Sequence, residues 1–409
     1  MAAPKLRFKE FDGDWLKSKI GDIFDVTSGS TPLRSDNRFF ENATIPWVKT
    51  TDLNNSFIIS TEEKISEIAL KETSVKIVPK NTVFVAMYGG FNQIGRTGLL
   101  LNESACNQAL SAIYPNENID SFFLLTYLNH KVDDWKSFAA SSRKDPNITK
   151  SDVLAFPMVY PSKKEQTKIA SFLSAVDEKI SQLTQKHQLL SQYKQGMMQK
   201  LFSQQLRFKA EDGSEFGEWE EKKLGEIASK VGSGSTPRGG AEAYVDDGII
   251  FIRSQNVNHD QLLLEDIVFI PENTHQKMAG SKVIANDILL NITGASIGRS
   301  CVVPKNFTEG NVNQHVCIIR TPNDEPKFIQ AFLSSKNGQD LIESYQTGSG
   351  REGLNFQSIR SFDLSMPCLE EQTKIANFLS AIDQKIEVVA QQIEQAKTWK
   401  KGLLQQMFV

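Results

Sequence analysis

The chain has 409 residues, of which 40% are hydrophobic and 23% charged, and its formal net charge is −3. These values are typical of a globular protein with room for two to three domains. The 46 basic residues are outnumbered by 49 acidic ones. This balance counts against a stand-alone, non-specific nucleic-acid binder, because neutralising phosphates usually requires a basic excess.

The sequence has no apolar stretch of signal-peptide length at its N-terminus, and its longest apolar run, near residues 122–128, is too short to span a bilayer. We therefore expect a cytoplasmic protein with no membrane partner. The four cysteines stand singly, without a Cys-x-x-Cys pair. This pattern argues against a zinc ribbon or a disulfide framework and favours buried thiols.

Two globular regions are predicted, over residues 1–158 and 206–365. Each contains short apolar runs typical of strands, such as residues 82–87 and 287–292, separated by Gly-rich turns. Each region also has a helical pattern in its later part, at residues 122–130 in the first and 328–335 in the second. The predicted fold class is α/β or α+β, with a strand-rich core in each region.

A long helix is predicted after each region, within residues 159–205 and 366–409. Pro161 and Pro367 precede the two helices and suit helix starts, where a missing N–H costs nothing. Apolar residues then recur at alternating intervals of four and three, which is typical of a coiled-coil seam. Each helix should contain about 38 residues and measure about 55 Å.

The sequence is an internal duplication. Residues 165–180 return 206 positions later as residues 371–386, with 13 of 16 positions identical. Shorter matches accompany this one: Leu-Arg-Phe at 6–8 and 206–208, Ser-Gly-Ser-Thr-Pro at 28–32 and 233–237, Ile-Gly-Arg at 94–96 and 297–299, and Asn-Gln at 107–108 and 313–314. The matches extend over the whole chain and predict two similar units.

Chain order favours antiparallel pairing of the two helices, although such a stripe also fits a helix packed on its own globular region. Antiparallel pairing lets the second region leave and return at one place, and it brings Phe408 back to the N-terminal region in a pseudo-two-fold arrangement. We expect His187 and Lys194, the polar positions in the first stripe, to set the register. The predicted interhelix or partner-facing residues are Ile169, Leu173, Val176, Ile180, Tyr193, Ile375, Leu379, Ile382, Ile386 and Trp399.

Several common catalytic and nucleotide-binding patterns are missing from the sequence. There is no Gly-Lys dipeptide for a P-loop and no His-Glu-x-x-His, and Gly232-Ser233-Gly234 lacks the third glycine of a dinucleotide fingerprint. We therefore predict a non-catalytic chain that binds no cofactor or metal of its own.

The loops differ between the two units while the framework agrees, which is typical of recognition domains that change target. Residues 49–52 (Lys-Thr-Thr-Asp) correspond to 253–256 (Arg-Ser-Gln-Asn), and 89–93 correspond to the shorter 294–296. Arg, Asn and Gln are side chains that read base edges. The predicted DNA-binding residues are Lys49, Thr50, Thr51, Asn54, Tyr88, Gln93, Arg96, Arg143, Lys144, Arg253, Ser254, Gln255, Asn256, Thr293, Ser296, Arg299 and Arg351.

Simpler roles fit some of the same residues. Each arginine fits equally well as a surface or strand-capping residue. The Asn-Gln and Ser-Gly-Ser-Thr-Pro pairs, which match between units, suit framework hydrogen bonds and turns better than specificity contacts.

Two variable regions, each followed by a near-identical helix that begins after a proline, resemble the specificity subunit (HsdS) of type I restriction-modification systems. Gly-Ser-Thr-Pro and Ile-Gly-Arg in each region support the resemblance. It implies a non-catalytic subunit whose two target-recognition domains each bind half of a bipartite, asymmetric site in double-stranded DNA.

The same resemblance implies partners. The helices would space the two domains and dock two modification (methyltransferase) subunits, and restriction subunits would add a motor and a nuclease. S-adenosylmethionine, ATP and Mg²⁺ would be bound by those partner subunits. A coiled-coil scaffold with two protein-binding globular ends is the alternative function that the residues leave open.

Overall fold

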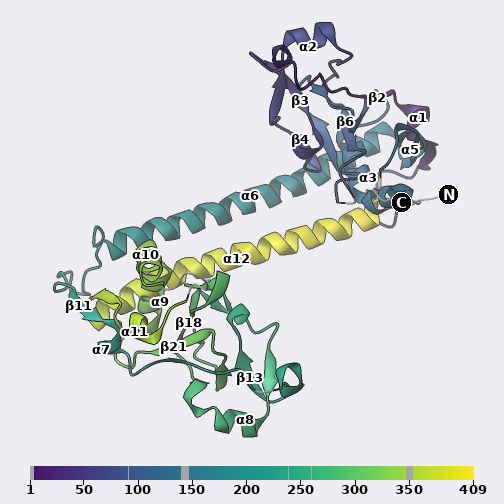
Figure 1. Ribbon diagram of the computed structural model, residues 1–409. Helices are drawn as coiled ribbons and strands as arrows, with labels where there is room; N and C mark the ends of the chain where they lie inside the picture. The colour runs from purple at the N-terminus through teal and green to yellow at the C-terminus, as the bar shows by residue number, and fades with distance from the viewer. Residues whose placement is uncertain (1–3, 91, 140–146, 238, 259, 347–352) are drawn as a thin grey trace. The chain divides into compact units, whose positions relative to one another are not determined.

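The computed structural model describes residues 4–90, 92–139, 147–237, 239–258, 260–346 and 353–409. By its internal contacts the chain divides into two units, residues 1–183 with 392–409 and residues 184–391 (Figure 1). Each unit contains one globular region, the first part of the helix that follows it and the last part of the other helix. The sequence instead predicts domain boundaries at the ends of the long helices, and these boundaries stay predictions.

The globular region of the first unit is built on a five-stranded sheet in the order β2-β9-β6-β7-β4 and a three-stranded sheet in the order β5-β3-β8. The strand predicted from the apolar run at 82–87 is β6. All four of its residues are buried, which explains why apolar residues follow one another there without alternation. A separate ladder pairs β1 with β10. The strands are β1 (Leu16–Lys19), β2 (Val26–Ser28), β3 (Ile45–Val48), β4 (Ser56–Ile58), β5 (Glu63–Ile65), β6 (Val83–Ala86), β7 (Thr97–Leu100), β8 (Ala105–Cys106), β9 (Leu110–Ile113) and β10 (Pro157–Tyr160).

Short helices cover these sheets. The predicted helix at 122–130 is confirmed as α3 (Ser121–His130), where the Asp120 carboxylate accepts hydrogen bonds from the first free backbone N–H groups, those of Phe122 and Phe123. The others in this unit are α1 (Ile20–Ile23), α2 (Glu67–Glu72), α4 (Val132–Ala139), α5 (Lys150–Ala155) and the 3₁₀ turns η1 (Asn37–Phe39) and η2 (Thr50–Asp52).

The second unit repeats this topology, as the duplication predicts. Its sheets have the orders β12-β21-β18-β19 and β16-β13-β20-β17, which correspond to β2-β9-β6-β7 and β5-β3-β8. The strands are β11 (Glu220–Lys223), β12 (Lys230–Ser233), β13 (Ile249–Ile252), β14 (Val257–Asn258), β15 (Gln261–Leu262), β16 (Val268–Ile270), β17 (Lys282–Val283), β18 (Ile288–Asn291), β19 (Ser300–Val302), β20 (Gly310–Val312), β21 (Val316–Arg320) and β22 (Asp363–Met366).

One difference between the repeats lies at the sheet edge. In the first unit β4 adds to β7 as a parallel strand, whereas the second unit has a hairpin of β14 and β15 and a parallel bridge from Asp260 to Cys301. Strand β11 pairs with β22. The helices of this region are α7 (Leu224–Ile227), α8 (Glu272–Lys277), α9 (Pro326–Ser334), α10 (Lys336–Ser344) and α11 (Phe356–Arg360), with 3₁₀ turns η3 (Gly240–Ala243), η4 (Ser254–Asn256), η5 (Ala279–Ser281) and η6 (Gly294–Ser296).

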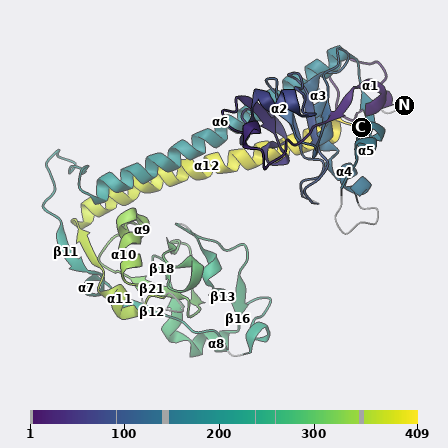
Figure 2. The same ribbon diagram turned by 45° about the horizontal axis from the view of Figure 1, so that its top comes forward.

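The two long helices are α6 (Lys163–Phe202, 40 residues) and α12 (Leu369–Met407, 39 residues). In the first unit the start of α6 lies beside the end of α12, where Phe172 contacts Trp399 with ring centroids 6.0 Å apart. In the second unit the start of α12 lies beside the end of α6 (Figures 1 and 2). The helices are therefore antiparallel, as predicted. No described helix is long and apolar enough to cross a membrane.

The apolar stripe of each helix has two partners. Ile169, Leu173 and Val176 belong to one buried cluster with Phe123 of the globular region and Leu403 of α12. Ile375, Leu379 and Ile382 occupy the same place in the second unit. The sequence presents packing on the globular region and packing between the helices as alternatives. In the structure the start of each helix does both.

The remaining predicted helix residues are less buried. Ile180 and Ile386 are partly buried against the same two clusters. Tyr193 and Trp399 are 51% and 53% exposed, respectively, so they lie on the surface of the helices rather than in the seam.

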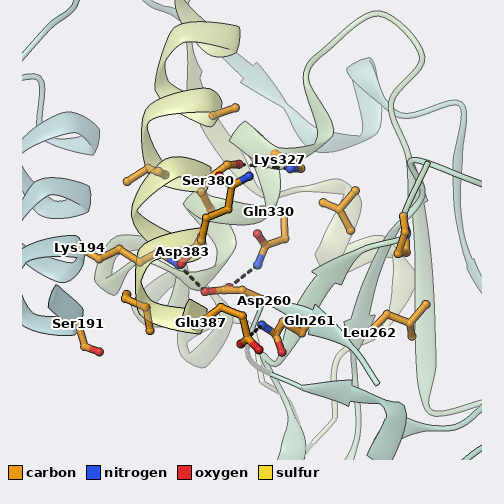
Figure 3. Close-up of a pocket in the computed structure, with 17 residues that line it drawn as sticks. Ser191, Lys194, Asp260, Gln261, Leu262, Lys327, Gln330, Ser380, Asp383 and Glu387 are labelled. Carbon is orange, nitrogen blue, oxygen red and sulfur yellow. Dashed lines mark hydrogen bonds and ion pairs between the residues drawn. The ribbon is translucent and has the colours of Figure 1, made fainter. Parts of the chain in front are cut away.

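Lys194, a polar residue in the apolar stripe of α6, bonds to both the facing helix and the globular region. Its Nζ lies 2.7 Å from Asp383 of α12 and 2.7 Å from Asp260 of the β14–β15 hairpin (Figure 3). Burial by itself lowers the pKa of Lys194, but the two carboxylates outweigh it and raise that pKa. Gln330 and Ser334 also donate to Asp260, at 2.6 and 2.7 Å. In the first unit Lys400 pairs with Asp177 at 2.5 Å, at the positions equivalent to Lys194 and Asp383.

The repeated Leu-Arg-Phe segment is tied to the repeated helix motif. Arg7 donates two hydrogen bonds of 2.7 Å to Glu165, and Phe8 packs edge-on against Phe172. In the second unit Arg207 donates to Glu371 at 3.1 and 2.7 Å. Bidentate Arg–carboxylate pairs are among the stronger hydrogen-bonded contacts. Each helix start is therefore held by a segment at the start of the globular region that precedes it.

The glutamine that follows fixes the helix start to the globular region. Gln166 accepts a hydrogen bond from Asp120 N (2.9 Å) and donates to Pro161 O (2.9 Å). Gln372 makes the equivalent bonds with Glu325 N and Pro367 O, both at 2.9 Å. The Glu-Gln pair of the repeated motif thus has a structural role in both units.

The expectation that all four thiols are buried is wrong for one of them. Cys106, Cys301 and Cys317 are buried, and burial raises the pKa of Cys106 and of Cys317 to about 12. Cys368 is exposed, because it lies in the surface link between β22 and α12.

We expect Arg207→Ala to destabilise the second unit by about 2 to 3 kcal/mol, because it leaves the fully buried Glu371 carboxylate without its cation. Trp219, whose Nε1 donates to Glu371 at 3.1 Å, provides a local fluorescence probe for urea unfolding. Lys336→Ala, which removes an exposed pair with Asp340, should change the midpoint little. Equal effects of the two variants would contradict the assignment.

Candidate nucleic-acid interface

A tight turn at residues 107–109 joins the loops of the first globular region. Asn107 N donates to Val48 O at the end of β3 (3.0 Å), and Met87 N, just after β6, donates to Ala109 O (2.8 Å). Ser30 N, just after β2, donates to Cys106 O (3.0 Å). The loops that follow β2, β3 and β6 therefore meet at one edge.

The second region has the same junction. Asn313 N donates to Ile252 O (3.0 Å), Ile292 N donates to His315 O (3.0 Å), and Gly234 N donates to Asn313 O (3.2 Å). Those predicted DNA-binding residues that the structure describes thus lie on loops that share one edge of their unit.

The cation of the loop after β3 is paired with carboxylates at the start of β5. Lys49 Nζ lies 2.7 Å from Glu63 and 3.0 Å from Glu62, and the hydrogen bond to Glu63, helped by Glu62, raises the pKa of Lys49. Thr51 donates to Glu62 at 3.1 Å, and Thr50 is half-buried at the start of η2. The charge of Lys49 is therefore largely neutralised by carboxylates of its own domain.

The equivalent loop after β13 uses the same design. Arg253 lies 3.6 Å from Asp266 Oδ1 and donates to Asp266 O at 3.2 Å, while Gln255 donates to Asp266 Oδ2 at 2.6 Å. Ser254 is half-buried, and its carbonyl accepts from Asn291 Nδ2 at 2.9 Å. The buried Nε of Arg253 lacks an acceptor among the described residues.

Asn256 has a structural role. It is 2% exposed, its oxygen accepts from Arg253 N (2.9 Å), and its nitrogen donates to Leu263 O (3.0 Å) and Asp266 O (2.8 Å). Both polar atoms of its side chain are therefore hydrogen-bonded inside the domain. We therefore assign Asn256 to holding the loop, as Asp52 does in the first unit through its 2.7 Å bond from Lys49 N.

The β6–β7 loop carries the next group of predicted residues. Tyr88 is exposed, and Gln93 is half-buried with its Oε1 unpaired among the described residues. Arg96 reaches Leu53 O at 3.5 Å, which places it against the end of the Lys49 loop. Asn54 holds the turn that follows, accepting from Ser56 N at 3.0 Å.

The corresponding loop of the second region contains η6. Thr293 Oγ1 lies 2.6 Å from His315 Nδ1, and Ser296 O accepts from Arg299 N at 3.1 Å. Within the described part of the chain, the Arg299 guanidinium has no hydrogen bond or ion pair. Of Arg96, Arg253 and Arg299, the predicted arginines that the structure describes, Arg299 is thus the least constrained by its own domain.

Three predicted residues, Arg143, Lys144 and Arg351, lie outside the described residues. The described residues that follow them are anchored at the same edge. Ile148 N donates to Met87 O (3.0 Å), and Leu354 N donates to Ile292 O (2.9 Å).

Two further repeated motifs meet at this edge. Thr31 donates its hydroxyl hydrogen to Gln108 Oε1, and Thr236 donates to Gln314 Oε1 at 2.5 Å. The Ser-Gly-Ser-Thr-Pro and Asn-Gln motifs, interpreted from the sequence as framework, are therefore partners of each other. His315, which lies 3.1 Å from Gln314 Nε2, was missed, because nothing in the sequence distinguishes it from a surface histidine.

A cavity of about 720 Å³ in the second unit surrounds the Lys194 cluster (Figure 3). Its charged groups are paired with neighbours: Lys194 with Asp260 and Asp383, Lys327 with Ser380, and Glu387 with Gln261. Across the described residues, no group of three or more His, Cys, Asp or Glu side chains is arranged to hold a metal ion. The cavity is therefore a less suitable candidate site than the loop edges.

Comparison with known proteins agrees with this architecture. The family model described as "Type I restriction modification DNA specificity domain" matches twice, at residues 12–192 and 217–398. The MjaIX type I restriction enzyme specificity subunit of Methanocaldococcus jannaschii is 28% identical over 80% of this chain and 78% of its own length. The MjaVIII specificity subunit of the same organism is 24% identical over 97% of this chain and 94% of its own.

A solved structure supports the fold. The S subunit of a type I restriction-modification system from M. genitalium superposes with a TM-score of 0.61, covering 100% of this chain and 99% of its own, at 17% identity. Two matches to one family model, one in each half, account for both globular regions and most of both helices. The chain therefore belongs to the family of the type I restriction modification DNA specificity domain, and it contains two copies of that domain.

Proposed function

We propose that this chain selects the DNA sequence on which a type I restriction-modification complex acts, and that each globular region binds one half of a bipartite site. The observation that carries the proposal is the pair of loop edges. The same loops are gathered by the same turn in each unit, but they carry different side chains. A constant frame with variable loops lets two related domains bind two different half-sites.

The side chains at each edge differ in how far hydrogen bonds and ion pairs within the domain leave them free to contact DNA. In the second region Arg299 and Ser296 make no side-chain hydrogen bond among the described residues, and Gln255 is exposed although tied to Asp266. In the first region Tyr88 and Arg96 are the less constrained candidates, since Lys49 is ion-paired. We assign base contacts first to Arg299 and Arg96, because guanidinium groups bind guanine in a bidentate manner.

The helices are proposed as the docking surface for two modification subunits. Large apolar side chains lie exposed on them, in the second unit Leu189, Tyr193 and Val388 and in the first Trp399. Aromatic and aliphatic side chains of this kind are typical of interface anchors. In this proposal S-adenosylmethionine, ATP and Mg²⁺ are bound by the partner subunits, and this chain contributes sequence selection.

Domain exchange tests the proposal. Replacing residues 206–365 by the equivalent region of a relative, with modification subunits co-expressed, should change one half of the methylated sequence and preserve the other. The reciprocal exchange of residues 12–158 should change the complementary half. Sequencing of methylated genomic sites measures both results, and a change in both halves from either exchange would contradict independent half-site binding.

Arg299→Ala should weaken methylation through the half-site of the second region by about 1 to 3 kcal/mol, because a bidentate contact to guanine is lost. The matched control is Lys305→Ala, which removes an exposed cation beyond the other end of β19 and should leave methylation unchanged. Competition between cognate and altered oligonucleotides measures the difference. Unchanged discrimination by Arg299→Ala would assign that arginine to the framework.

Helix length should set the number of unread base pairs between the half-sites. Four residues inserted after Gln185 and four after Gln391, its equivalent 206 positions later, lengthen both antiparallel helices together by about 6 Å and about one turn. At about 3.4 Å per base pair, the preferred spacer should grow by one or two base pairs while both half-site sequences persist. An active double insertion with an unaltered spacer would show that the helices do not set the spacing.

A further inference from the structure

Gln108 and Gln314 are exposed glutamines at equivalent places in the two repeats. In each, the side-chain oxygen accepts a hydrogen bond from a threonine hydroxyl, that of Thr31 in the first unit and that of Thr236 in the second. Because the oxygen is occupied, the amide nitrogen is left on the other arm of the side chain. Each glutamine therefore presents hydrogen-bond donors in a fixed orientation.

In each domain the amide nitrogen of the glutamine keeps at least one hydrogen without an acceptor among the described residues. Among the described residues, Gln108 Nε2 has no hydrogen-bond partner. Gln314 Nε2 lies 3.1 Å from His315 Nε2, and His315 Nδ1 lies 2.6 Å from Thr293 Oγ1. An amide group carries two hydrogens, so Gln314 keeps one donor after bonding to His315.

The backbone behind each glutamine is firmly held. Asn107 Oδ1 accepts from Ala109 N at 3.2 Å, and Asn313 Oδ1 accepts from His315 N at 3.0 Å. On the threonine side of the first unit, Trp47 Nε1 donates to Ser30 O at 3.2 Å. Side chains fixed in this way lose less conformational entropy when they bind a partner.

Both glutamines lie on the turns that gather the candidate recognition loops. The loops around them differ between the units, but the Thr–Gln pair is the same in both. A contact that stays constant while the base-reading loops vary suits the constant part of DNA, which is the phosphate backbone. Glutamine side chains are among those that bind phosphate oxygens and set the register of a protein on the duplex.

We propose that Gln108 and Gln314 each donate a hydrogen bond to a DNA backbone phosphate and thereby position the two recognition edges on the duplex. Thr31 and Thr236 act as positioning residues that aim the amide groups. This inference rests on the proposed function and adds to it a contact that is independent of base sequence.

The test uses the complete complex with co-expressed modification subunits and measures binding to an oligonucleotide that contains the site methylated by the wild type. Gln108→Glu keeps the oxygen that accepts from Thr31 but replaces the donor with a negative charge. We expect affinity to fall about tenfold or more at low salt, with the methylated sequence unchanged. Gln314→Glu should have the same effect through the second domain.

Asn102→Asp is the matched control, because it makes the same amide-to-carboxylate change at an exposed position. Asn102 follows the C-terminal end of β7, whereas the loop of the candidate edge precedes its N-terminal end. It should bind as the wild type does. Thr31→Val removes the aiming hydroxyl while preserving shape and should weaken binding about twofold to fivefold, and Thr31→Ser should restore it.

Two results would overturn the inference: Gln108→Glu binding as tightly as Asn102→Asp, or Gln108→Glu changing the methylated sequence, which would make the residue a base reader. If Gln108→Glu fails to assemble, the Thr31→Val and Thr31→Ser pair decides, and equal affinities for those two would overturn it. A wild-type complex without any preferred sequence would instead refute the proposed function, so the two failures are distinguishable.

Discussion

The attachment of each long helix to a globular core is the constraint on which the other features depend. A 40-residue helix with one apolar stripe gains most of its stability from what that stripe packs against. Here the first turns are bonded through a buried glutamate, Glu165 or Glu371, to an arginine near the start of the preceding globular region. The last turns insert into a core as well: Phe408 packs on Phe123 in the first unit, and Phe202 packs on Phe328 in the second. Each helix is therefore fixed by side chains at both ends.

The two units differ in how the helix pair is bonded to the globular region. In both, a lysine at an equivalent stripe position pairs with an aspartate of the facing helix, Lys400 with Asp177 and Lys194 with Asp383. Only in the second unit, among the described residues, does the lysine also bind a carboxylate of the globular region, Asp260. Asp260 lies in the hairpin that follows the η4 loop. In the second unit the β14–β15 hairpin therefore connects a candidate recognition loop to an ion pair between the helices.

The cations of the candidate recognition loops after β3 and β13 are paired with carboxylates of their own domains. Lys49 is bonded to Glu62 and Glu63, and Arg253 to Asp266. These carboxylates reduce the non-specific attraction to phosphate that free cations would supply, because that attraction scales with the charge neutralised on binding. What remains is a frame of oriented hydrogen-bond donors, which favours discrimination by geometry.

The sequence alone determined the duplication, the two strand-rich regions and the antiparallel helices, because these follow from repeat spacing, apolar periodicity and chain order, which are all local or countable. It also identified most of the loops that meet at each edge, since their divergence between repeats is visible in the residues. Only the tertiary structure decided which side chains within those loops are available. The asparagine of the Arg253 loop looks like a base reader in sequence but is buried, and the exposed cysteine before α12 looks like a core thiol. Partners such as Thr31 with Gln108, or Lys194 with Asp260, are 77 and 66 positions apart. Their contact depends on sheet order and loop closure, which no local pattern encodes.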